Sequence, residues 1–171
     1  RRAGKLSGGM KQKLALCCAL IHKPKVLLLD EPTTGVDVVS RKEFWQMLNR
    51  LKEQDISIFV STPYMDEASL CDRIALIQEG KILSTSTPQQ IVSDFDQTLY
   101  AASTPNIYPL LQHLRAQSAV ERCYPFGEFL HLTLKIGTDV SLFEQELKKT
   151  FADLRWSVIT PTIEDSFIQL M

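Results

Sequence analysis

Several features are scarce in this sequence of 171 residues, and each absence narrows the class of protein. No apolar run approaches the roughly 20 residues that a bilayer span needs, so we expect no direct membrane insertion. No charged segment followed by an apolar stretch opens the sequence, as a secretory signal would require. Neither charge sign predominates, with 19 basic and 20 acidic residues, which argues against a nucleic-acid partner.

Cysteine is also sparse, and its spacing excludes the common metal and redox motifs. The four cysteines show neither C-x-x-C spacing nor accompanying histidines; they are Cys17, Cys18, Cys71 and Cys123. Because free cysteine is among the most frequently buried residues, we expect reduced thiols in the core.

Helices and strands alternate in the first 95 residues. Ser7 is predicted to cap a helix whose apolar residues recur at helical spacing, at Met10, Leu14, Cys17 and Ile21. The apolar run from Val26 to Leu29 predicts a strand buried on both faces, as in a parallel sheet. Further along we predict a helix over 39–54, a strand over 56–60, a short helix over 65–71, hairpin strands over 73–78 and 81–85, and a helix closing this part near Phe95.

The remainder, 96–171, follows a different order. The pattern predicts strand 98–102, helix 106–117, strands 119–124 and 129–135, helix 140–151, strand 156–159 and a final helix from Thr162. This β-α-β-β-α-β order is typical of an α+β ferredoxin-like domain. We therefore predict two domains, 1–95 and 96–171.

Two segments of the first part carry residues that could bind a ligand or take part in catalysis. Leu6 to Gln12 places a glycine pair at the start of a helix, where unpaired N–H groups favour a phosphate, although a merely capped helix is the alternative. Asp30 and Glu31 follow a buried strand, where an acid can hold Mg²⁺ and its neighbour can polarise a water, although a solvated turn is the alternative.

Together with Thr34-Gly35-Val36-Asp37, these two segments resemble the signature motif, Walker B motif and D-loop of an ABC-type ATPase. The resemblance implies an α/β fold for residues 1–95, part of a P-loop NTPase core of the RecA-like ABC type with parallel strands. It implies that Asp30 helps to hold Mg²⁺ and that Glu31 is the catalytic base. It assigns nucleotide binding across a dimer to Ser7, Gly8, Gly9, Gln12 and Asp37.

The second part, 96–171, is similar to the C-terminal extension of ATPase subunits of ABC-2 type exporters, where it is accessory. It shows no catalytic constellation, and we expect His113 and His131 to be structural or solvated.

One departure from the family is the missing phosphate loop. Nothing in the sequence matches G-x-x-x-x-G-K-[ST], the loop that cradles the nucleotide phosphates. We expect the chain to be the later portion of a longer polypeptide, to bind ATP poorly alone, and to expose an apolar edge or face of its sheet.

A second departure is Pro63, which stands where the family ordinarily has the histidine of the switch segment. Proline has no side-chain donor and no N–H. We therefore expect the site built on Asp30 and Glu31 to hydrolyse slowly or only to bind. The intact signature serves a partner's site, which favours an asymmetric pair of domains, separate or fused; an ordinary homodimer is the alternative.

We therefore predict that the chain is part of the ATPase subunit of an ABC-2 type exporter. It would bind ATP and Mg²⁺ and work with a second ABC ATPase domain and a membrane permease at the cytoplasmic face. An ABC ATPase of translation or DNA repair is an alternative. A non-catalytic dimerisation module is another.

Overall fold

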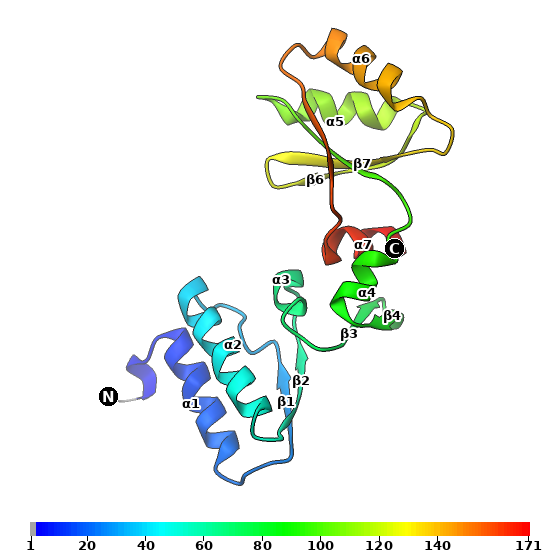
Figure 1. The fold of residues 1–171 in the computed structure, drawn as a ribbon. Helices are drawn as coiled ribbons and strands as arrows, with labels where there is room; N and C mark the ends of the chain where they lie inside the picture. Colours follow the sequence, from blue (N-terminus) through cyan, green and yellow to red (C-terminus); the bar gives the residue numbers. More distant parts are fainter. Residues whose placement is uncertain (1–2) are drawn as a thin grey trace. The chain divides into compact units, whose positions relative to one another are not determined.

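The computed structural model describes residues 3–171 and divides into two compact units, one ending at Ile74 and the other running from Ala75 to Met171 (Figure 1). The division into domains at Phe95 stays a prediction. Helix α4, Pro88–Ser93, ends just before that boundary and packs against α7, Ile163–Leu170, in the second unit.

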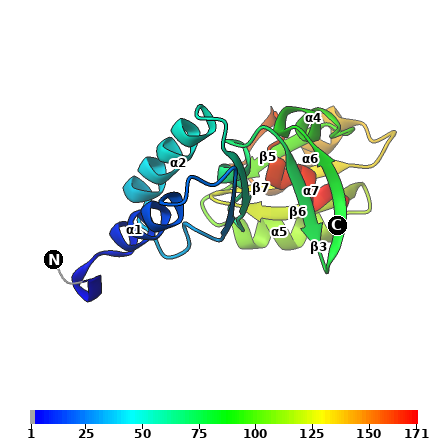
Figure 2. The same cartoon turned by 90° about the horizontal axis from the view of Figure 1, so that it is seen from below.

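The first unit is built on a pair of parallel strands. Its elements are η1 Ala3–Lys5, α1 Gly8–Leu20, β1 Val26–Asp30, α2 Val38–Lys52, β2 Ser57–Ser61 and α3 Met65–Ala68. Strands β1 and β2 run in register from the pair Val26 and Ser57 to the pair Asp30 and Ser61. Helices α1 and α2 lie side by side (Figure 2). The α/β class with parallel strands is therefore confirmed.

Burial in β1 differs from the prediction. Leu27 is buried at 5% exposure against α2, whereas Val26 and Leu28 are 58% and 73% exposed. Phe59 on β2 is 67% exposed as well. The prediction of a strand buried on both faces was wrong for the described residues, because both helices pack on one face. The expected exposure of an apolar sheet face is present.

The prediction that the apolar stripe of α1 forms its buried face was also wrong. Met10, Leu14 and Ile21 are exposed at 40%, 46% and 72%, and the buried residues are Gly9 and Leu16. Leu16 joins a core with Leu27, Phe44, Trp45 and Leu48. A helix with a glycine on its packing face can approach its neighbour closely, and this geometry rather than the apolar count decides which face is buried.

The cysteine prediction holds in part. All four thiols are free, but Cys17 and Cys18 are exposed on α1. Cys71 and Cys123 are half-buried, and burial raises the pKa of both, that of Cys123 to about 11.

The second unit contains the predicted β-α-β-β-α-β arrangement. Its elements are the two-stranded sheet of β3 Ile74–Gln78 and β4 Lys81–Ser86, then α4, β5 Leu99–Ser103, α5 Ile107–Ala116, β6 Val120–Phe126, β7 Phe129–Leu134, α6 Val140–Thr150, β8 Arg155–Ile159 and α7. The antiparallel sheet has the order β6-β7-β5-β8. The turn before β4 has positive φ at Glu79 and Gly80, as a tight hairpin requires.

The four-stranded sheet separates two layers. Helices α5 and α6 cover one face, and α7 lies on the other (Figure 1). The core on the α5 and α6 side contains ten residues: Tyr100, Ala102, Leu110, Leu111, Leu114, Leu130, Leu132, Phe143, Leu147 and Leu154.

A buried polar cluster joins α7 to the other face of the sheet. His131 and Asp165 are 6% and 0% exposed, and the Nδ1 atom of His131 lies 2.7 Å from the Asp165 carboxylate. Tyr124 donates to the same oxygen at 2.8 Å, and Phe126 stacks on the imidazole. The other carboxylate oxygen accepts from Thr162, completing a capping box at the start of α7. His131 is thus structural, as expected.

This cluster predicts an acid-dependent loss of stability. Burial acts to raise the pKa of Asp165, but the hydrogen bonds from His131, Thr162 and Tyr124 outweigh it and lower the pKa below its ordinary 3.8. A lowered folded pKa stabilises the fold above the unfolded pKa, and that contribution is lost as the pH falls through the folded value. Asp165→Asn should lower the free energy of unfolding at pH 7 by about 2–4 kcal/mol.

Urea unfolding between pH 3 and 7 measures both effects. The exposed Asp153→Asn serves as the control. Equal stability and equal pH dependence of the two variants would contradict the role assigned to the cluster.

Candidate functional site

The acidic pair lies where the two parallel strands end. Asp30 is the last residue of β1, and its register partner Ser61 is the last residue of β2. The Ser61 hydroxyl donates to the Asp30 carboxylate. Asp30 and Glu31 are both exposed. The carboxyl ends of parallel strands are where α/β sheets bind ligands, so the predicted pair occupies the expected edge.

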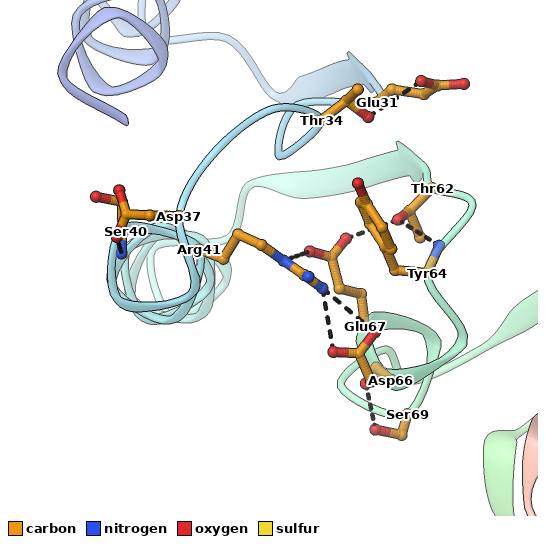
Figure 3. Close-up of polar contacts among 10 residues, drawn as sticks. All are labelled: Glu31, Thr34, Asp37, Ser40, Arg41, Thr62, Tyr64, Asp66, Glu67 and Ser69. Carbon is orange, nitrogen blue, oxygen red and sulfur yellow. Dashed lines mark hydrogen bonds and ion pairs between the residues drawn. The ribbon is translucent and has the colours of Figure 1, made fainter. Parts of the chain in front are cut away.

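Glu31 has a strained backbone that its surroundings hold in place. Its φ is +43°, in the left-handed region. The Glu31 N–H donates to Ser61 O at 3.0 Å and Ser61 Oγ at 3.1 Å. Thr34 Oγ1 donates to the Glu31 carboxylate at 3.1 Å (Figure 3). Such outliers concentrate at functional sites, and this one fixes the direction of an acidic side chain.

The oxygens at this edge fit a magnesium ion. Carboxylates and hydroxyls are its preferred protein ligands, and Mg²⁺ is usually held by one or two carboxylates together with substrate phosphates. Within 3–171 no group of three or more His, Cys, Asp and Glu side chains could hold a metal. Asp30 and Glu31 are the carboxylates at this edge that would hold such an ion.

Asp37 begins α2. Its Oδ1 accepts the Ser40 N–H at 2.9 Å (Figure 3). The backbone and side-chain hydrogen bonds of Ser40 lower the pKa of the exposed Asp37 carboxyl. Asp37 therefore carries its charge at neutral pH and is the N-cap of α2 in this structure.

The glycine pair packs against the segment that carries Asp37. Ser7 caps α1 by accepting the Met10 N–H at 3.3 Å. A Cβ on Gly8 would lie 3.2 Å from Gly35 O, and one on Gly9 would lie 2.5 Å from Ser40 Cβ. The close approach that these glycines allow is therefore to 35–40 in the chain itself. Gln12 is half-buried on α1.

Pro63 follows β2 in a segment held by its neighbours. Pro63 is exposed. The Tyr64 N–H donates to Thr62 Oγ1 at 3.2 Å, and Thr62 Oγ1 donates to Glu67 at 2.7 Å. The segment thus has a defined path on both sides of the proline.

Sequence reasoning missed the network that holds this segment. Glu67 is buried at 2% exposure and accepts from Arg41 Nε at 3.0 Å. Arg41 also pairs with Asp66 and lies 4.1 Å from the centroid of the Tyr64 ring (Figure 3). The only signal in the sequence is a charged residue of each sign on two separate elements, which does not specify a pair.

Two groupings of the predicted residues therefore emerge in the first unit. Asp30 and Glu31 meet Ser61 at the strand ends. Gly8 and Gly9 meet the segment that Asp37 caps. None of the helices in the described part, 3–171, is long and apolar enough to cross a membrane.

Known proteins are similar to this chain over nearly its whole length. The family model described as "ABC transporter" matches residues 1–34. The "Probable multidrug ABC transporter ATP-binding protein YbhF" of Escherichia coli K12 is 37% identical over 173 residues, covering 100% of this chain and 30% of that protein. The "Nod factor export ATP-binding protein I" of Paraburkholderia xenovorans is 34% identical over 171 residues, covering 99% of this chain and 54% of that protein. The chain thus spans about a third to a half of the length of these two relatives.

Solved structures share the fold of about half of this chain. The chain is similar to cbiO1 from Clostridium perfringens, part of the ABC transporter complex cbiONQ, with a TM-score of 0.50, 32% identity and coverage of 54% of this chain and 38% of that one. A nucleotide-free ATP-binding cassette gives a TM-score of 0.52 at 24% identity, covering 56% of this chain and 40% of that one, which shows the fold alone. The family match, these relatives and the shared fold identify an ABC transporter nucleotide-binding domain within this chain.

Proposed function

We propose that this chain is part of the ATP-hydrolysing subunit of an ABC-2 type exporter. The observation that carries the proposal is the acidic pair at the strand ends, Asp30 and Glu31, joined to Ser61 on the neighbouring strand. A helix with a capped glycine pair packs on the loop that follows this pair. Relatives whose names include multidrug and export ATP-binding proteins support the transport role.

Each residue at the strand ends has a distinct task in this proposal. Asp30 holds Mg²⁺, and Glu31 orients the attacking water with the carboxylate that Thr34 fixes. Bound Mg²⁺ neutralises charge on the phosphates. An exposed carboxylate oxygen with a fixed direction can accept a hydrogen bond from a water, which is the requirement for this role.

The nucleotide-binding residues serve a second domain. Ser7, Gly8, Gly9 and Gln12 at the start of α1 would contact the γ-phosphate of ATP held by a partner ABC ATPase domain. Asp37, charged and exposed at the start of α2, would contact that partner. Both groups lie on the packed body of α1 and α2, so one docking event engages them together.

The site built on Asp30 and Glu31 is proposed to be degenerate. Pro63 offers no donor toward a phosphate, whereas the acidic pair and the signature are intact. This combination favours an asymmetric pair in which the other composite site is competent, either in one fused chain or in two chains. The alternative is a homodimer in which Pro63 slows both sites.

The subunit would act at the cytoplasmic face of a membrane through a permease. An ATPase of translation or DNA repair would have no such partner, so affinity purification of the full-length protein from solubilised membranes separates the two. Recovery of a membrane permease is expected. Recovery of ribosomes or DNA instead would contradict the exporter role.

The third candidate, a non-catalytic dimerisation module, fits a sequence without the phosphate loop. Tight binding of ATP and Mg²⁺ by the isolated chain in titration calorimetry would exclude it. Weak or no binding is expected for the chain by itself, and ATP hydrolysis by the full-length protein would exclude the module reading.

A further inference from the structure

Helix α2 contacts both the signature helix α1 and the segment that follows β2. At its start, Ser40 faces Gly9 of the signature helix, since a Cβ on Gly9 would lie 2.6 Å from Ser40 Oγ. The next residue, Arg41, reaches the segment after β2 instead. Ser40 thus contacts α1, which would serve a partner domain. The adjacent Arg41 contacts the segment after β2, which would serve this domain.

Arg41 binds the switch segment, Ser61 to Ala68, at three points. Its Nε donates to Glu67 at 3.0 Å, and its Nη2 donates to the Asp66 carboxylate at 3.1 Å. Its guanidinium lies over the Tyr64 ring. A planar, permanently charged fork is suited to such a set of contacts, and a lysine could make only part of it.

The burial of the contacts distinguishes this network from a surface ion pair. The side chains of Glu67 and Arg41 are 2% and 20% exposed. An exposed ion pair contributes little, whereas a buried carboxylate that loses its partner is strongly disfavoured. Glu67 is further tied to the strand end because it accepts from Thr62, the residue before Pro63.

We propose that Arg41 is a positioning residue that fixes the switch segment, Ser61 to Ala68, relative to the start of α2. The proposal rests on the function proposed above. Through Glu67 and Thr62, Arg41 holds position 63 beside the strand end that carries Ser61, which itself contacts Asp30 and Glu31. Movement of α2 on docking of a partner is thereby transmitted to the site of this domain.

Kinetics of the full-length protein test the proposal in a Pro63→His background, in which this site is expected to hydrolyse. Arg41→Met should lower the part of kcat that Pro63→His adds about 10-fold and leave KM within about two-fold, since misplacement of a catalytic segment costs rate rather than binding. Arg41→Lys should recover part of the loss. The exposed Arg50→Met on the same helix is the matched control.

A kcat for Arg41→Met equal to that of Arg50→Met would overturn the proposal. If Arg41→Met does not fold, the isosteric Glu67→Gln decides in the same way, because it weakens the same contact. In the double variant Arg41→Met with Glu67→Gln, the loss should not exceed that of Arg41→Met alone.

Hydrogen exchange separates this inference from the proposed function. In Arg41→Met, the amides of 62–68 should exchange about 10-fold faster than in Arg50→Met, with β1 unchanged. Faster exchange in a protein that hydrolyses no ATP would refute the proposed function but support the positioning role of Arg41. Unchanged amide exchange of 62–68 in Arg41→Met would overturn the positioning role of Arg41, whatever the ATPase activity.

Discussion

A Pro63→His substitution in the full-length protein should raise ATP hydrolysis at the site of Asp30 and Glu31 about 10²-fold, the effect of one well-placed donor. Histidine supplies the side-chain donor that proline lacks. The exposed position leaves room for the imidazole, and the hydrogen bonds of Thr62 with Tyr64 and Glu67 hold the backbone on either side. Phosphate release in a single turnover, in which each site hydrolyses at most one ATP, measures the change at this site.

The size of the change in total turnover distinguishes the two arrangements of sites. In an asymmetric pair the restored site at most roughly doubles a turnover that the competent site already supports. In a homodimer with two slowed sites, turnover rises by the full factor. Pro63→Ala, which removes the ring but adds no donor, is the control. An unchanged rate at this site after Pro63→His, or an equal rise in Pro63→Ala, would contradict a degenerate site.

Gly9→Ala is expected to destabilise the first unit by about 1–3 kcal/mol and to abolish the activity that depends on the signature. The added Cβ would lie 2.5 Å from Ser40 Cβ and 2.6 Å from Ser40 Oγ, closer than packed atoms tolerate. Because α1 and α2 pack at this contact, the helices must separate, and the segment that Asp37 caps must move. Thermal unfolding and ATPase activity report the two effects.

A second substitution tests the physical reason. Ser40→Gly removes the two atoms that Gly9→Ala would strike, so the double variant should regain most of the stability and the activity. Gly4→Ala is the matched control, because a Cβ on Gly4 would meet nothing within 4 Å. A Gly9→Ala variant as stable as Gly4→Ala would contradict the packing role of the glycine.

Local patterns in the sequence predicted the elements well where the chemistry is local. The strand that ends at Asp30 and the hairpin strands on either side of Glu79 and Gly80 follow from residues adjacent in the chain. The parallel pairing of β1 with β2 followed from the intervening helix, which is the connection that parallel strands need.

Tertiary features could not be predicted in the same way. The packing face of α1 was misassigned, since the apolar stripe that includes Met10 is exposed and the buried face contains Gly9 and Leu16. The pairs of Arg41 with Glu67 and of His131 with Asp165 join residues 26 and 34 positions apart. No spacing rule connects such residues, because the fold alone brings them together.

The candidate site shows the same division. The positions of Asp30, Glu31 and Asp37 at the ends of elements agree with their predicted places. The glycine pair also has a packing role that was not predicted, because a Cβ on either glycine would lie toward Gly35 or Ser40. The functional roles of these residues stay predictions until they are tested.

The number of ATP molecules hydrolysed per pair of domains in a single turnover shows most directly whether one of the two sites is degenerate. Rapid mixing of the full-length protein with labelled ATP and Mg²⁺ would follow the fast phase of phosphate release. The account predicts that one of the two bound ATP molecules is hydrolysed in that phase, while the ATP at the site of Asp30, Glu31 and Pro63 stays intact. Fast hydrolysis of both, at identical rates, would contradict it.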